Sequence, residues 1–112
     1  MSTLERLNAD EFDTPDPEHR CLSLEEAGPV LDSLTSETAQ SVLVELSRDP
    51  ATPGDVADRV DTSIQNVSYH LSKLEDAGLV TVVGTRYSSK GREMKVYAPA
   101  VRSLVIGGAT GE

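Results

Sequence analysis

The chain has 112 residues, of which 38% are hydrophobic and 26% charged, and this fits one small globular domain. No apolar run approaches the ~18 residues of a membrane span, and the acidic N-terminus does not resemble a secretory signal. The single cysteine, Cys21, cannot form an internal disulfide. We therefore expect a cytoplasmic protein with one modest core and no membrane partner.

The net charge of -9 is distributed unevenly along the chain. Residues 1–61 carry 15 acidic and 4 basic side chains, whereas residues 62–112 carry 4 acidic and 6 basic ones. This asymmetry predicts a nucleic-acid-binding part in the second half. The many carboxylates, and the excess of Arg over Lys, are typical of proteins from salt-loving archaea. The alternative is an ordinary acidic cytosolic protein.

Residues 1–20 are predicted to form a flexible acidic arm, because they are rich in acids, contain two prolines and show little periodicity. Next, Ser23 and Glu26 have the spacing of a capping box, which predicts a first helix that ends near Leu34. A proline inside a helix removes a hydrogen bond, so we expect this helix to be broken or kinked at residues 28–29.

Three further helices are predicted downstream. The first starts near Ser36, and its apolar side chains fall on one face, at Ala39, Val42, Leu43 and Leu46. A short helix over residues 52–60 has Thr52 as its cap and a proline at its first position. A longer helix over residues 63–77 begins at the cap Ser63 and is followed by a glycine, a natural C-terminal stop.

After the last helix the hydrophobic period changes to two, which predicts β-strands. We expect one strand over residues 79–83 and a returning strand over residues 94–97, with a loop at residues 87–91. Gly84 permits a bulge or bend in the first strand. Residues 101–106 form a candidate third strand.

This order of elements predicts an α+β fold, a winged helix-turn-helix with three to four helices and a two-stranded β-wing. We expect the winged helix-turn-helix domain over residues 21–100. The acidic arm of residues 1–20 precedes it, and a C-terminal strand and tail of residues 101–112 follow it.

The helix predicted over residues 63–77 has one apolar and one polar face. Val67, Leu71, Leu74 and Ile64 form a stripe that we expect to be buried. The opposite face carries no acid over its first two turns, although the chain has 19 acids. Its Gln and short polar side chains are suited to reading base edges with the N-terminal part of the helix. The alternative is an ordinary solvated helix face.

The predicted hairpin adds positive charge beside this helix. Residues 86–95 hold four of the ten basic side chains against one acid. Cations on an exposed loop can bind DNA phosphates. The alternative is that these charges only keep an exposed hairpin edge from pairing with another strand. The residues predicted to bind DNA are therefore Thr52, Ser63, Gln65, Asn66, Ser68, Tyr69, Ser72, Lys73, Arg86, Lys90, Arg92 and Lys95.

Residues 67–80 read V-S-Y-H-L-S-K-L-E-D-A-G-L-V, which resembles the pattern V-S-x-H-L-x-x-L-x-x-A-G-L-V of ArsR-type winged helix-turn-helix regulators. The resemblance covers residues 30–98, and residues 84–87 are similar to archaeal members. It implies a sequence-specific regulator of transcription that binds double-stranded DNA as a homodimer. By the motif match, Ser68 lies near DNA and a half-buried His70 braces the helix. In this interpretation the helix over 63–77 enters the major groove and the wing over 86–95 holds phosphate.

Many members of that family bind metal through a Cys pair on the first helix of the motif, but residues 53–60 contain no Cys or His. Others use a C-terminal helix, for which residues 101–112 are too short and too strand-like. We therefore expect no metal, no cofactor and no small-molecule effector, and a dimer surface in residues 22–34, in residues 100–106, or in both. No catalytic constellation is present, so we expect no enzyme. The alternative function is a winged-helix module that binds protein without reading DNA.

Overall fold

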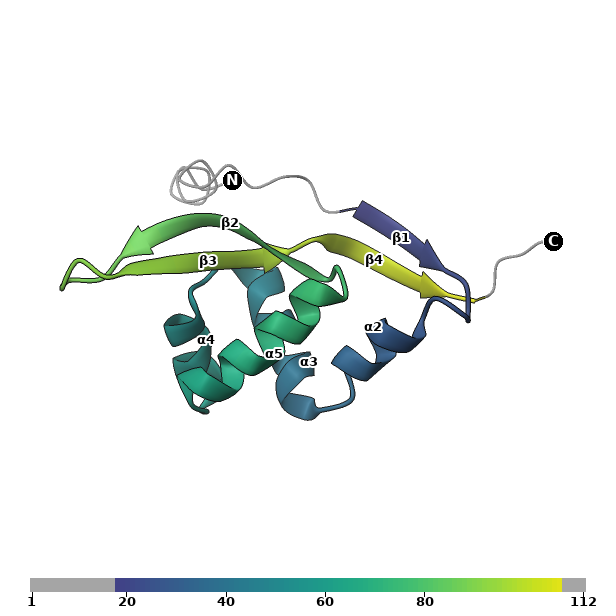
Figure 1. Ribbon diagram of the computed structural model, residues 1–112, viewed down its shortest axis with the longest axis horizontal. Helices are drawn as coiled ribbons and strands as arrows, with labels where there is room; N and C mark the ends of the chain where they lie inside the picture. Colours follow the sequence, from purple (N-terminus) through teal and green to yellow (C-terminus); the bar gives the residue numbers. More distant parts are fainter. Residues whose placement is uncertain (1–17, 108–112) are drawn as a thin grey trace.

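A computed structural model describes residues 18–107 of the chain. Figure 1 shows the helices on one side of an extended β layer, with a hairpin projecting past them at one end. This arrangement confirms the predicted α+β winged helix-turn-helix. No helix within the described range is long and apolar enough to cross a membrane. The elements follow in the order β1 (Glu18–Leu22), α2 (Gly28–Ser33), α3 (Glu37–Arg48), α4 (Pro53–Val60), α5 (Ile64–Asp76), β2 (Val80–Tyr87), β3 (Glu93–Pro99) and β4 (Val101–Ile106).

Three hydroxyl side chains start the last three helices, as predicted. Ser36, Thr52 and Ser63 each accept a hydrogen bond from the backbone N–H three residues later, at 3.0, 3.2 and 3.0 Å. Each bond satisfies one of the amide donors that a helix N-terminus leaves without a partner. The starts of α3, α4 and α5 therefore follow from local chemistry alone.

The first helix begins later than predicted. Ser23 and Glu26 do form the reciprocal bonds of a capping box, at 2.9 and 3.1 Å, but residues 24–26 form a turn and α2 begins only at Gly28. Pro29 lies in the first helical turn, where its missing N–H costs no hydrogen bond. The prediction of a break at residues 28–29 is therefore wrong, because the Gly-Pro pair starts the helix.

The core lies where α3, α4 and α5 meet the β2–β3 hairpin. Its largest fully buried side chains are Leu46, Leu71, Leu74, Leu79, Val42, Val56, Val67 and Val96. The predicted stripe on α5 is thus confirmed at three positions, but it is wrong for Ile64, which is 57% exposed. Ile64 is the first residue of α5, and its side chain lies beside Gly54 at the edge of the core.

The wing is the antiparallel hairpin of β2 and β3, and both strands are longer than predicted. Their register shifts between Val82 and Gly84, which confirms the predicted bulge. A bulge bends the strand and increases its twist. The two strands continue past the helices, so the loop between them lies at the far end of the molecule (Figure 1).

A second, parallel pair of strands joins the two ends of the described chain. β1 pairs with β4, which confirms a strand over residues 101–106 but gives it an unpredicted partner. The predicted arm of residues 1–20 is therefore wrong for residues 18–20, and its remainder lies outside the described residues. Of the five residues of β1 only Leu22 is buried, so the strand has no hydrophobic pattern that would predict it. It forms through backbone hydrogen bonds to β4.

The C-terminus of α5 is a Schellman motif centred on Gly78. Gly78 has a φ of 79°, and its N–H donates to Glu75 O while the N–H of Leu79 donates to Leu74 O, both at 2.9 Å. A Cβ at Gly78 would lie 2.5 Å from Nη1 of Arg20, a residue of β1. The backbone conformation therefore favours glycine here, and a Cβ would also displace the Arg20 guanidinium.

We expect Gly78→Ala to lower the free energy of unfolding by about 1–2 kcal/mol, because the left-handed conformation and the contact with Arg20 both oppose a Cβ. Urea unfolding measures the change. Gly28→Ala is the matched control, since a Cβ there meets nothing within 4 Å and the residue has no positive φ. Equal stability of the two variants would contradict the assignment.

Candidate nucleic-acid interface

Helices α4 and α5 form the helix-turn-helix. α4 ends at Asp61, which has a left-handed φ of 61° and donates its N–H to Ala57 O. The turn closes at Ser63, the N-cap of α5. Because the stripe of Val67, Leu71 and Leu74 faces the core, the opposite side of α5 faces away from the protein.

Over residues 64–74 the outer side of α5 carries polar side chains and no acid, and the exposed Glu75 and Asp76 follow only at its C-terminal end. Gln65, Ser68, Tyr69 and Ser72 are all exposed and share one face at helical spacing. No carboxylate occurs between residues 64 and 74. The structure thus brings together the four side chains that form the centre of the predicted DNA-binding set, on a surface that would not repel phosphate.

Three of the predicted DNA-binding residues form hydrogen bonds at helix starts, Thr52 at that of α4 and Ser63 and Asn66 at that of α5. Thr52 is only 2% exposed and caps α4, so its predicted role as a DNA contact is wrong for lack of accessible surface. Ser63 caps α5 by accepting from Asn66 N. The side-chain amide of Asn66 donates to Thr62 Oγ1 at 3.0 Å, which fixes the start of α5.

Lys73 joins α5 to α2. Its Nζ lies 3.1 Å from Asp32 Oδ2 and 5.6 Å from the centre of the Tyr69 ring. The hydrogen bond and charge of Asp32 raise the pKa of Lys73, so the ammonium stays protonated. Asp32 therefore neutralises part of the charge that Lys73 would offer to DNA.

His70 is half-buried beside the exposed face, as the family resemblance implies. Its ring meets that of Tyr69 edge to face, with centroids 5.1 Å apart. Burial, and secondarily the charge of Lys73, lower the pKa of His70, so the imidazole is neutral at pH 7. A neutral, partly buried ring here supports the helix rather than contacting phosphate.

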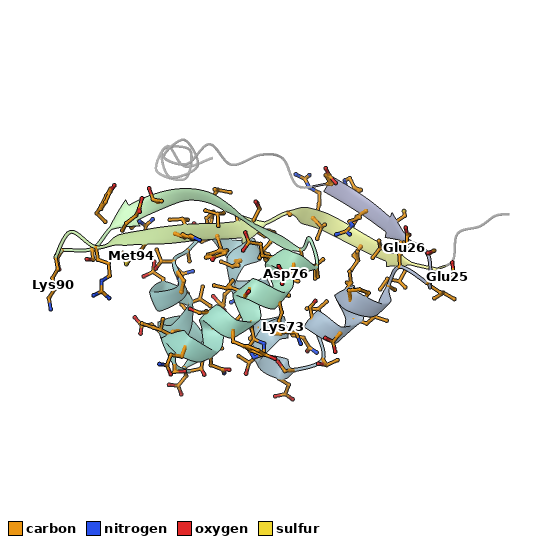
Figure 2. All side chains as sticks on the ribbon, viewed as in Figure 1. Glu25, Glu26, Lys73, Asp76, Lys90 and Met94 are labelled. Atoms are coloured by element: carbon orange, nitrogen blue, oxygen red, sulfur yellow. The ribbon has the colours of Figure 1, made fainter. Side chains whose placement is uncertain are left out.

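The tip of the wing is held in a fixed shape by Ser88. Its Oγ accepts from the backbone N–H of Lys90 at 3.3 Å and of Arg92 at 3.0 Å. Gly91, with a φ of 80°, donates its N–H to Ser88 O. Figure 2 shows Lys90 at the far end of the hairpin, beyond the helices. This loop therefore presents its cations at a distance from the acidic body.

The cations of the wing differ in what they contact. The side chains of Lys90, Arg92 and Lys95 are exposed and form no ion pair or hydrogen bond within residues 18–107. By contrast, Nη1 of Arg86 lies 3.3 Å from Asp55 Oδ2, at the start of α4. Arg86 thus ties the wing to the helix-turn-helix, whereas the other three remain available to phosphate.

Three further residues at or behind this surface carry no motif that predicts them from the sequence. Tyr87, beside the wing loop, is 65% exposed, and a lone aromatic next to four cations was a signal that could have marked it. Arg20 and Asp32 reach α5 from β1 and α2, and no motif marks either.

Among residues 18–107, no group of three or more His, Cys, Asp and Glu side chains is placed to hold a metal ion.

Comparison with known proteins agrees with this geometry. Residues 34–83 match the model of a helix-turn-helix domain, whereas no curated protein matches the chain. An ArsR-like transcriptional regulator from Rhodococcus sp. RHA1 is 32% identical over 67% of this chain and 65% of its own length, with a TM-score of 0.56. The cadmium metal-sensor CMTR from Mycobacterium tuberculosis is 32% identical over 66% of this chain and 71% of its own, with a TM-score of 0.50.

A third similar structure shows the fold alone, because its identity is only 19%. It is the homodimeric winged helix-turn-helix DNA-binding domain of a candidate ArsR-family regulator from Mycobacterium bovis. The match covers 69% of this chain and 66% of that one, with a TM-score of 0.54.

We expect His70 to make stability depend on pH. Its folded-state pKa is lowered below the ordinary value of about 6.5, so the unfolded chain binds the proton more readily. The free energy of unfolding should therefore be highest above about pH 6.5 and fall as the pH drops through that value. His70→Gln should remove this component in urea unfolding at a series of pH values, while His19→Gln, at an exposed histidine, should retain it. An unchanged pH profile in His70→Gln would refute the assignment.

Proposed function

Because the chain belongs to the ArsR-type family of winged helix-turn-helix transcription regulators, which bind DNA, we propose that it recognises a specific double-stranded sequence as a homodimer. In this proposal α5 enters the major groove and the wing contacts the adjacent phosphates. The observation that carries it is the polar, acid-free face of residues 64–74 of α5, together with three wing cations that have no partner among residues 18–107.

The N-terminal half of α5 suits the reading of bases. Recognition helices contact base edges with their first turns, and the first turn of α5 contains no acid. Gln65 is exposed there, and a glutamine amide can bond both N6 and N7 of adenine. Ser68 and Ser72 follow on the same face as short donors and acceptors.

The charge distribution supports specific binding over coating of DNA. A net charge of -9 repels a polyanion in general, so affinity has to come from the few places where cations gather. Lys90, Arg92 and Lys95 form such a place on the wing. Cytoplasmic location and origin in a salt-loving archaeon remain predictions from the same composition.

The homodimer is supported by the homodimeric domain from Mycobacterium bovis. A two-fold dimer places its recognition helices about 34 Å apart on one face of the duplex, so its target would be an inverted repeat. The dimer surface stays a proposal in residues 22–34, in residues 100–106, or in both.

We expect the wild-type chain to enrich duplexes that contain an inverted repeat from a random-sequence pool. Gln65→Ala should cost about 1–3 kcal/mol on the enriched duplex and relax the preference at one base pair, because it removes a base contact. Fluorescence anisotropy on the enriched duplex and on a scrambled one measures both effects.

Gln40→Ala is the control for this test, since it changes an exposed glutamine that bonds Leu34 O, away from α5. It should leave the ratio of the two affinities unchanged. A pool from which nothing is enriched would favour the alternative of a protein-binding module. Enrichment of single half-sites would argue against the dimer.

We expect Lys90→Ala/Arg92→Ala to weaken binding to the enriched and scrambled duplexes equally, because phosphate contacts carry no sequence information. Each lost contact should make the log–log dependence of affinity on salt shallower by about one unit. Arg48→Ala removes one charge from an exposed position off the wing and serves as the control, compared per charge removed. An equal effect per charge in the two variants would show that the wing makes no direct contact.

A further inference from the structure

Two side chains from outside residues 34–83, the region that matches the helix-turn-helix domain, contact α5. Arg20 contacts its C-terminal end from β1, and Asp32 contacts its side from α2. We propose that Arg20 and Asp32 are positioning residues, which hold α5 in the orientation that reads DNA. This role rests on the proposed function, since it assigns the orientation of a helix that contacts bases.

Arg20 supplies the hydrogen bonds that the end of α5 lacks. The Schellman motif uses the carbonyls of Leu74 and Glu75, which leaves the last carbonyls without helical partners. Nη1 of Arg20 donates to Ala77 O at 3.0 Å and to Gly78 O at 3.3 Å. The negative end of the helix dipole also favours a cation at this place. Because β1 is paired with β4, the end of α5 is tied to the parallel sheet.

Asp32 holds α5 about one turn earlier. A surface hollow of about 170 Å³, lined in part by Pro29 and Asp76, lies between α2 and α5, outside the buried contact of Val30 with the core. The ion pair of Asp32 and Lys73 borders this hollow, and Figure 2 shows the position of Lys73 on the helix. Such an exposed pair adds little to stability. Its effect should therefore appear in the placement of the helix.

The geometry makes base reading sensitive to these contacts. The buried stripe of Val67, Leu71 and Leu74 fixes which face of α5 points inward but constrains tilt less strongly. At a rise of about 1.5 Å per residue, Gln65 lies about 18 Å from Ala77, so a tilt of about 5° at the anchored end displaces Gln65 by about 1.5 Å. A hydrogen bond to a base edge does not tolerate a shift of that size.

Positioning and simple charge predict different outcomes, which allows a decisive test. Asp32→Asn removes a negative charge and releases Lys73, so electrostatics alone should tighten binding to every duplex. Positioning predicts instead a lower ratio of affinities for enriched and scrambled DNA. Arg20→Ala removes a positive charge, and Arg48→Ala makes the same change at an exposed position on α3, outside both segments proposed for the dimer surface.

The test measures binding of each full-length variant to a duplex enriched from a random pool by the wild type and to its scrambled version. We expect Arg20→Ala and Asp32→Asn each to lower the affinity ratio about fivefold to tenfold, and Arg20→Lys to restore part of it. Arg48→Ala and Asp58→Asn, the charge-matched controls, should leave the ratio unchanged.

Amide hydrogen exchange without DNA supplies a second readout. In Arg20→Ala, the amides of Ala77, Gly78 and Leu79 should exchange about tenfold faster while those of α3 are unchanged; a general loss of stability would accelerate all of them. If the wild type prefers the enriched duplex over the scrambled one and the affinity ratio is unchanged in Arg20→Ala and Asp32→Asn, only the positioning role is overturned. A wild type that does not discriminate would overturn the proposed function and this role with it.

Discussion

Burial of one face of α5 is the interaction on which the rest of the structure depends. Val67, Leu71 and Leu74 recur at the helical period and are inaccessible to solvent between α3, α4 and the hairpin. Because a helix has a fixed period, burying these three side chains also decides which residues face outward. The candidate reading face is therefore a consequence of core packing.

The acidic composition of the chain constrains how such a face can meet DNA. Carboxylates are absent from residues 64–74 of α5, and three cations without partners among residues 18–107, Lys90, Arg92 and Lys95, lie on the hairpin that projects from the body. Two other cations near this surface, Lys73 and Arg86, are paired with Asp32 and Asp55. These two pairs link neighbouring elements, so the protein uses part of its positive charge to fix geometry.

The parallel pair of β1 and β4 extends the fold beyond the matched helix-turn-helix region. Ala100 donates its N–H to Leu79 O and accepts from Glu18 N, so β1 and β2 follow one another along the same edge of β3 and β4. The wing and the ends of the described chain are thus joined at Ala100, the single residue between β3 and β4. Through Arg20 this sheet also contacts the end of α5, and it connects the surface proposed for dimerisation to the helix proposed to read bases.

The sequence by itself determined the elements whose causes are local. The hydroxyl caps at Ser36, Thr52 and Ser63, the stop at Gly78 and the alternation in the hairpin each act over a few residues, so the helices, the wing and the outer face of α5 were all predictable. The exposed members of the predicted site followed from the same periodicity.

Only the tertiary structure decided what depends on distant neighbours. β1 forms because β4, from the other end of the described chain, supplies its hydrogen-bond partners. No pattern within residues 18–22 predicts this strand. The exposure of Ile64, the burial of Thr52 and the ion pairs of Lys73 and Arg86 depend on how the elements pack. The helical period determines in which direction a side chain points from its own helix. Whether that side chain is buried or forms an ion pair depends on which residues of other elements lie on that side.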